Sequence, residues 1–430
     1  VEDLQTGKIR MLTKRSSDTV INGTFDWVYE EELSLRDGFR WSPDGKAIAY
    51  WQLDEEGVPE MHMLNNVSGY YPKLITFRYP KTGETNAICR VGVVQLDDAK
   101  TTWMKVPGDP RNHYLARMKW AENSDELLLQ QLNRLQNQNK VMLADAHSGE
   151  VKTVYTDEDK AWIEVRFGFT RWIEKGKRFT YVSEREGWRQ LYLVSRDGKT
   201  VLKVTDGKYD IIRTLKVDEA KDLLYFIGSP DNATERYLYR IGLNGKGLKR
   251  LSPADQTGSH SYNISPDAKW ALHTFSNIES PPVTNLIELP SHKLIRVMEK
   301  NQRLRGKLAK LKRPKAEFFR VKIDDGVSVD AYAVLPPKLD PNKKYPLLIY
   351  VYGEPAGQTT VNSWRGSGGL WHWMLAQQGY VVMSIDNRGT TAPRGNAWRK
   401  SIYRQVGILA SKDQAAAVKQ QYQCQHAGDT

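Results

Sequence analysis

Two adjacent carboxylates, Glu31 and Glu32, are the residues whose type and spacing most directly suggest binding chemistry. Neighbouring carboxylates repel each other unless a cation joins them, and a buried cation needs the same compensation. Taken alone, an acidic run of this kind is typical of a solvated surface turn. The pair therefore leaves two interpretations open, a cation site and a solvated turn.

The cysteines and histidines are too few or too scattered to form a disulfide scaffold or a metal site. The 2 cysteines, Cys89 and Cys424, rule out a disulfide scaffold and a four-cysteine zinc site, although the two could pair. Cys424 and His426 would supply two metal ligands at most, and no glycine-rich phosphate loop precedes a helix. We therefore expect no metal and no cofactor.

Basic residues are concentrated in one part of the chain. The net charge is +12, and residues 301–430 hold 20 basic against 9 acidic residues. Nucleic-acid binding would need such a patch together with a recognised binding fold, which we do not find. We interpret residues 301–316 as a solvated basic linker and expect no nucleic-acid partner. No run of about 18 apolar residues exists, so we expect no membrane segment.

Repeated units precede this linker. Each has a polar turn followed by an apolar strand, as in Trp41-Ser42-Pro43-Asp44-Gly45 before Ala47-Ile48-Ala49-Tyr50-Trp51. The units start near residues 41, 119, 171, 216 and 263. Asp-Gly turns suit hairpins because glycine tolerates positive φ. The spacing predicts a mainly β fold, with four-stranded propeller blades over residues 1–300. We expect the ring to be incomplete, and residues 1–14 to be the last strands of another blade.

Residues 317–430 follow a different pattern. We expect strands over 317–323, 327–335, 345–352 and 379–386, and helices over 370–378 and 412–421. The strands at 345–352 and 379–386 are continuous apolar runs, typical of burial on both faces. This order predicts the first part of a parallel α/β sheet. Because that sheet would be incomplete, we expect the side chains near Ile385 to lack their usual neighbours.

Five segments resemble, in the expected order, the dipeptidyl peptidase IV branch of the prolyl oligopeptidase family of serine peptidases. They are Asp26-Trp27-Val28-Tyr29-Glu30-Glu31-Glu32, Asn133-Arg134-Leu135-Gln136-Asn137, Ser183-Glu184-Arg185-Glu186-Gly187-Trp188-Arg189-Gln190-Leu191-Tyr192, Tyr345-Pro346-Leu347-Leu348-Ile349-Tyr350-Val351-Tyr352-Gly353 and Asp386-Asn387-Arg388-Gly389-Thr390. The resemblance extends to about Val418. It implies an N-terminal β-propeller, a C-terminal α/β-hydrolase domain, and removal of dipeptides that have Pro or Ala in second position from free N-termini.

The resemblance also implies roles for individual residues. Glu31 and Glu32 would bind the ammonium group of the substrate's N-terminus, and Tyr352 would stabilise the oxyanion of the tetrahedral intermediate. Arg388, by its position after Asp386-Asn387, is instead interpreted as a structural residue that orders its loop through hydrogen bonds. The implied partner is a peptide with a free N-terminus. The full-length parent could form a homodimer, and a periplasmic or extracellular location is favoured.

The catalytic triad of this family is missing from the sequence. No serine lies in a Gly-x-Ser-x-Gly elbow, which an Asp and a His should follow in chain order. The nearest match, Ser367, has Arg365 in place of the first glycine, and we interpret it as part of a flexible loop. His372 is interpreted as a packing residue. Glu354 and Thr391 also depart from the family pattern.

Three functional hypotheses remain. The chain is a fragment of a serine-type dipeptidyl aminopeptidase, inactive by itself, or a non-catalytic propeller that acts as a scaffold or binds peptides. A complete hydrolase with another nucleophile is the third. The start at Val1 and the change of character after Val418 favour a fragment.

Overall fold

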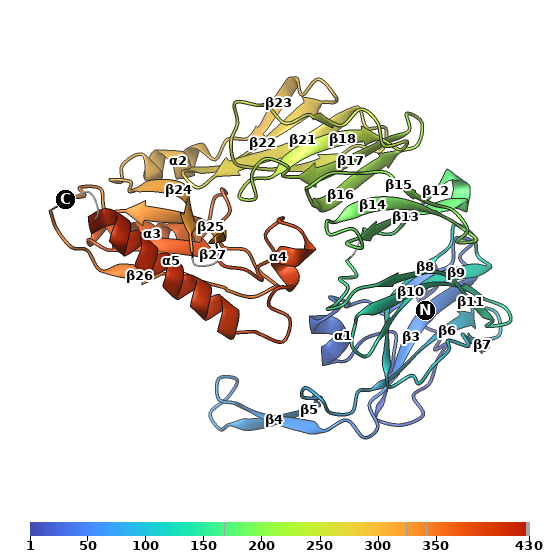
Figure 1. The fold of residues 1–430 in the computed structure, drawn as a ribbon. Coiled ribbons are helices and arrows are strands. Elements are labelled where there is room, and N and C mark those ends of the chain that lie inside the picture. Colours follow the sequence, from blue (N-terminus) through green and yellow to red (C-terminus); the bar gives the residue numbers. More distant parts are fainter. Residues whose placement is uncertain (167, 324–325, 341, 427–430) are drawn as a thin grey trace. The chain divides into compact units, whose positions relative to one another are not determined.

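The structure is a computed structural model, and it describes residues 1–166, 168–323, 326–340 and 342–426 (Figure 1). The chain divides into two compact units. The first comprises residues 1–181 and 193–201, and the second comprises residues 182–192 and 202–430. Each unit is described by itself below.

Antiparallel sheets build the first unit. One sheet has the order β1-β3-β6-β7, with β2 paired to β3, and the next has the order β11-β10-β9-β8. β4 and β5 form a separate two-stranded hairpin. The strands are β1 (Val20–Asn22), β2 (Phe39–Trp41), β3 (Ala47–Asp54), β4 (Glu60–Asn65), β5 (Lys73–Arg78), β6 (Ile88–Gln95), β7 (Thr101–Trp103), β8 (His113–Trp120), β9 (Glu126–Asn133), β10 (Gln138–Asp145) and β11 (Val151–Glu158). One short helix, α1 (Trp27–Glu31), precedes β2.

Three further four-stranded sheets follow in chain order, each made of consecutive strands. The boundary between the two units runs through the first of them. The strands are β12 (Arg171–Ile173), β13 (Arg178–Ser183), β14 (Gln190–Ser195), β15 (Val201–Lys203), β16 (Ile211–Asp218), β17 (Leu223–Gly228), β18 (Tyr237–Gly242), β19 (Lys249–Arg250), β20 (Ser259–Ile264), β21 (Trp270–Asn277), β22 (Ser280–Glu288) and β23 (Leu294–Glu299). The 3₁₀ turn η1 (Glu174–Gly176) lies between β12 and β13.

These five sheets confirm the predicted blades: four of them have the predicted four strands, and the first has five. Trp41, Trp120 and Trp172, which open three of the repeats, all lie on strands. The Asp-Gly turn at Gly198 has φ +76°, and a Cβ there would lie 1.7 Å from the carbonyl oxygen of Val154. Only glycine fits this turn, which accounts for its place in the repeat.

The prediction for residues 1–14 was wrong. This segment contains no strand of a blade: its two arms pair only with each other, through the antiparallel Glu2–Ile9 bridge and backbone hydrogen bonds between Val1 and Arg10 and from Asp3 to Lys8. Most of its side chains are exposed, including Leu4 and Ile9. A segment that buries so little apolar surface has little to stabilise a sheet.

The second unit also contains a sheet with the order β24-β25-β27-β26. We predicted a parallel sheet, but only β26 and β27 are parallel, whereas β24 with β25 and β25 with β27 are antiparallel. The elements are α2 (Gln302–Leu308), β24 (Lys315–Lys322), β25 (Ser328–Leu335), β26 (Leu347–Ile349), α3 (Gly366–Gln377), β27 (Val381–Asp386), α4 (Asn396–Lys400) and α5 (Ile408–His426). Across the described ranges, no helix is both long and apolar enough to cross a membrane.

Two local predictions in this region were also wrong. The strand predicted over 345–352 is only the three residues of β26, and Tyr350, Val351 and Tyr352 beyond it are all exposed. The segment Gly366-Ser367-Gly368-Gly369 is the first turn of α3, not a flexible loop.

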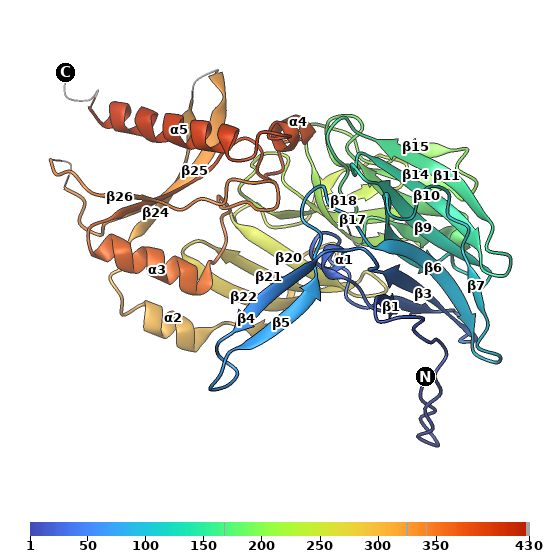
Figure 2. The ribbon, with the colours of Figure 1, turned by 90° about the horizontal axis from the view of Figure 1, so that it is seen from below.

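Helices cover both faces of this sheet (Figure 2). On one face, Tyr332 and Val382 pack with Trp373 of α3 in one buried cluster. On the other face, Met383 and Ile385 pack with Ala417 of α5 in another. Ile385 is fully buried, so the expectation that it would lack neighbours was wrong because α5 covers it.

Candidate functional site

The helix that carries the two glutamates is anchored by its buried residues. Asp26 caps the start of α1, where its Oδ1 accepts a hydrogen bond of 2.9 Å from the Tyr29 amide. Tyr29 is 2% exposed, and its hydroxyl accepts a hydrogen bond of 3.1 Å from the Leu115 amide of β8. Beyond the helix, the Arg117 guanidinium donates to the Leu33 carbonyl at 2.9 Å. Both sides of the acidic pair are therefore tied to the same buried strand.

Glu31 and Glu32 lie at the carboxyl end of α1. Glu31 is the last helical residue and Glu32 is the C-cap, and both are exposed. Within the described part of the chain, neither carboxylate forms an ion pair or a side-chain hydrogen bond, and the last turn contains no basic residue. The carboxyl end of a helix carries a partial negative charge, and this charge favours a bound cation. Two carboxylates added at this end make it a suitable place for an ammonium group.

Tyr352 belongs to the second unit and lies in the loop after β26. It is 52% exposed, and among the described residues its hydroxyl has no hydrogen-bond partner. Gly357 packs against its ring, since a Cβ at this glycine would lie 2.6 Å from the ring carbon Cδ1. The Asn387 side chain donates a hydrogen bond of 3.0 Å to the Gly353 carbonyl. The ring of Tyr352 thus packs against Gly357, the next residue Gly353 is held by Asn387, and the hydroxyl remains able to donate.

Arg388 orders its loop, as the sequence predicted. Its Nη2 and Nε atoms donate to the two carboxylate oxygens of Asp413 in α5, at 2.7 and 3.0 Å. Asp413 is 1% exposed and also accepts a hydrogen bond from the Arg388 amide. A bidentate pair of this type fixes both partners.

The structure also places the other histidine, serine and cysteine residues that the sequence analysis considered. His372 is 3% exposed and packs its ring 5.0 Å from that of Tyr350, which confirms a packing role. Ser367 is exposed in the first turn of α3. Cys89 is a buried free thiol, and burial raises its pKa to about 12, so it is not a nucleophile at neutral pH. The side chains of Cys424 and His426 lie outside the described residues.

No metal site is present among the residues that the structure describes, because no group of three or more potential ligands comes together there.

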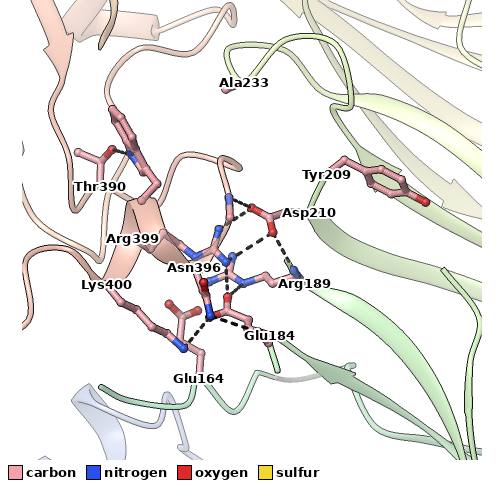
Figure 3. Close-up of polar contacts among 12 residues, drawn as sticks. Glu164, Glu184, Arg189, Tyr209, Asp210, Ala233, Thr390, Asn396, Arg399 and Lys400 are labelled. Carbon is pink, nitrogen blue, oxygen red and sulfur yellow. Dashed lines mark hydrogen bonds and ion pairs between the residues drawn. The ribbon is translucent and has the colours of Figure 1, made fainter. Parts of the chain in front are cut away.

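A buried charge cluster in the second unit was not foreseen from the sequence (Figure 3). Arg399 of α4 is 1% exposed and pairs with Asp210, which is fully buried, and with Glu184. Glu184 also accepts from Arg189 at 2.7 Å and from Lys400 at 2.8 Å. Burial alone would raise the pKa of Glu184, but these three cations hold it well below its usual range. Removing one partner from such a pair typically costs about 3–5 kcal/mol.

Comparison with known proteins identifies the family. The sequence model described as the dipeptidyl peptidase IV N-terminal region matches residues 1–282. The chain belongs to the dipeptidyl peptidase IV family. A second model, the prolyl oligopeptidase family, matches residues 371–427. Glu31 and Glu32 fall in the first matched segment.

Solved structures agree with this assignment. Dipeptidyl peptidase 4 of Porphyromonas gingivalis has a TM-score of 0.91 at 29% identity, over 97% of this chain and 58% of that one. A dipeptidyl aminopeptidase IV described as putative, from Bacteroides ovatus, shares the fold with a TM-score of 0.84 at 23% identity, over 95% of this chain and 59% of that one.

Curated relatives in this family cover more sequence than the chain does. Dipeptidyl peptidase 4 of Trichophyton rubrum is 26% identical over 96% of this chain and 55% of its own length. A probable dipeptidyl peptidase 4 of Emericella nidulans is 27% identical over 96% and 56%. The chain therefore spans about half of the length of the curated relatives that it matches.

Proposed function

We propose that this chain is part of a serine-type dipeptidyl aminopeptidase that removes X-Pro and X-Ala dipeptides from free N-termini. The observation that carries the proposal is the unpaired carboxylate pair Glu31–Glu32, held at the carboxyl end of the anchored helix α1 within a segment that matches the family. The names of the relatives support the dipeptidyl peptidase activity of the whole protein.

The acidic pair would select the substrate by its terminus. A substrate ammonium would form charge-assisted hydrogen bonds with both carboxylates. An acetylated terminus offers no such charge. Anchoring the first residue in this way sets how far the chain extends before the scissile bond, which explains release of a unit of fixed length.

Tyr352 would act at the scissile carbonyl. A hydroxyl placed where negative charge develops lowers the barrier by about 3–4 kcal/mol. The exposed, unpartnered hydroxyl of Tyr352 suits this role. The nucleophile, the base and the orienting acid are not supplied by this sequence, which has no Gly-x-Ser-x-Gly elbow.

A chromogenic dipeptide substrate with Pro in second position tests the proposal. A longer protein that contains this chain and a Gly-x-Ser-x-Gly segment should release the chromophore, whereas residues 1–430 alone should not. Loss of a triad as a unit costs about 10⁶-fold in turnover. Turnover by residues 1–430 that is abolished by Ser367→Ala would contradict the proposal, because it would reveal a nucleophile in the first turn of α3.

The alternative function is a non-catalytic propeller that serves as a scaffold or binds peptides. The same unpaired glutamates favour it, since ammonium binding needs no triad. The coding sequence on both sides of this chain separates the two proposals. A downstream elbow in frame supports the peptidase, and an intact upstream start with a stop codon in place of the elbow supports the binding module.

For the full-length parent we also propose a homodimer. The β4–β5 hairpin exposes Leu64, Tyr70 and Tyr71, and residues 61–72 contain no Asp, Glu, Lys or Arg. An uncharged apolar surface can meet its own copy without repulsion between like charges. Sedimentation of the parent with Leu64→Lys and Tyr71→Lys should show a monomer where the unchanged parent is a dimer.

A further inference from the structure

The buried Arg399 cluster ties α4 to two segments of the neighbouring blades in the second unit (Figure 3). Asp210 accepts from the Gly395 amide at 3.0 Å as well as from the Arg399 guanidinium. The Asn396 amide donates to the Gly187 carbonyl at 2.8 Å. A Cβ at Gly395 would lie 2.9 Å from that same Gly187 carbonyl oxygen, so the two backbones meet as closely as glycine allows.

From α4, a continuous set of hydrogen bonds leads back toward Tyr352. The Gly389 amide donates to the Trp398 carbonyl at 3.0 Å. The Trp398 indole donates to Thr390 Oγ1 at 3.3 Å, and that hydroxyl donates to the Asn387 carbonyl at 3.1 Å. Asn387 in turn donates to the Gly353 carbonyl, next to Tyr352.

A second branch reaches the ring of the same tyrosine. The Thr391 amide donates to the Gly357 carbonyl at 3.3 Å. Gly357 is the residue whose Cα lies against the Tyr352 ring. The segment 387–399 is therefore attached to the blades at one end, and at the other to Gly353 and to Gly357, the residue that packs against the Tyr352 ring.

We propose that Arg399 is a positioning residue for Tyr352. By pairing with Asp210 and Glu184, it fixes the start of α4 against the blades, and segment 387–399 passes that position on to the loop of Tyr352. The inference deepens the proposed function, because it concerns the residue to which the oxyanion role is assigned. Arginine suits the task because its planar fork fixes the geometry of its two carboxylate partners, whereas a lysine ammonium is a point charge on a flexible stem.

The test observes Tyr352 directly and does not depend on hydrolysis. Residues 1–430 are prepared with 3-fluorotyrosine at position 352, and its ¹⁹F resonance is recorded with and without Arg399→Met. We expect the substitution to shift or broaden this resonance, and Arg399→Lys to restore it only partly. Gly357→Ala is the positive control, because its Cβ would displace the ring.

Arg305→Met is the matched negative control. Arg305 of α2 lies in the same unit, and among the described residues its side chain donates to Lys300, Ser280 and Pro281, none of which belongs to segment 387–399. It should lower the melting temperature and leave the Tyr352 resonance unchanged. A merely structural role for Arg399 predicts the same pattern, so folded Arg399→Met protein with an unchanged resonance would overturn the proposal.

Asp210→Asn keeps the test decisive if Arg399→Met fails to fold. It retains an oxygen acceptor for the Gly395 amide and removes one charge of the cluster. If Asp210→Asn shifts the ¹⁹F resonance of Tyr352 in the same direction as Gly357→Ala but by less, the proposal is supported. An unchanged resonance rejects it. Either result leaves the proposed peptidase function to be judged by its own substrate assay.

Discussion

The carboxylate of Asp26 accepts a hydrogen bond from the Tyr29 amide at 2.9 Å, and only 7% of Asp26 is exposed. Burial raises the pKa of this carboxyl to about 6, above its unfolded value of 3.8. The folded state therefore holds the proton more tightly than the unfolded chain. Ionisation of Asp26 lowers the stability as pH rises from about 4 to about 6, by about 3 kcal/mol.

Asp26→Asn should remove this loss of stability. Asparagine retains a side-chain oxygen that can cap α1 but carries no charge. We expect a higher free energy of unfolding than wild type at pH 7.5, with no gain at pH 4, in urea denaturation followed across this range.

Asp44→Asn provides a control that should change the stability at pH 7.5 in the opposite direction. Asp44 is an exposed turn acceptor, and its hydrogen bonds from Ser42 and Lys46 lower its pKa. Because its folded pKa is lowered, the Asp44 carboxylate stabilises the fold at pH values above its unfolded pKa. The Asn variant should therefore be less stable than wild type at pH 7.5. If Asp26→Asn lost as much stability at pH 7.5 as Asp44→Asn, the prediction that the buried charge of Asp26 destabilises the fold would be contradicted.

Three histidines lie together in the last blade: His260 of β20 stacks on His273 of β21, and His292 of the β22–β23 turn meets His273 edge to face. His260 Nδ1 lies 2.9 Å from His273 Nε2, and the His292 ring is 4.8 Å from that of His273. Burial lowers the pKa of His260 to about 4 and that of His273 to about 3. Because the unfolded chain takes up these protons near pH 6.5, stability should fall as the pH drops from about 6.5 toward 4.

His260→Gln should make this fall shallower. Removing one histidine that titrates only on unfolding reduces the slope of the free energy of unfolding by about 1.4 kcal/mol per pH unit over this range. Urea denaturation at pH 4.5 to 6.5 measures the slope. His62→Gln, at an exposed position of β4, is the control and should leave it unchanged. Equal slopes for His260→Gln and wild type would reject the assignment.

The blades could be predicted from the sequence because their signals are local. A turn such as Asp197-Gly198 followed by an apolar run specifies a hairpin within a few residues. The length of β26 could not be predicted in this way. Leu347 to Tyr352 form an apolar run, but how much of it pairs and is buried depends on strands and helices distant in sequence. The start of α3 was missed because three glycines in its first turn are poor helix formers.

The candidate site was predictable only where a short motif carries it. Glu31, Glu32 and Tyr352 each lie within a contiguous segment that resembles the family, and their assigned roles remain predictions. Arg399 pairs with Glu184 across 215 residues and with Asp210 across 189. Neither separation leaves a periodic or compositional signal, so the cluster became visible only in three dimensions.

The acidic pair gives the sharpest prediction for this chain. If Glu31 and Glu32 form an ammonium site, a peptide with a free N-terminus should bind better than its acetylated twin. Because both carboxylates are exposed, the preference should be weak and should fade as salt is added. Calorimetry at low salt measures it, and Glu31→Gln and Glu32→Gln should each abolish it. Glu30→Gln removes an equal charge one residue earlier on α1 and should keep the preference. Equal affinity of the unchanged chain for both peptides would leave Glu31 and Glu32 as a solvated pair.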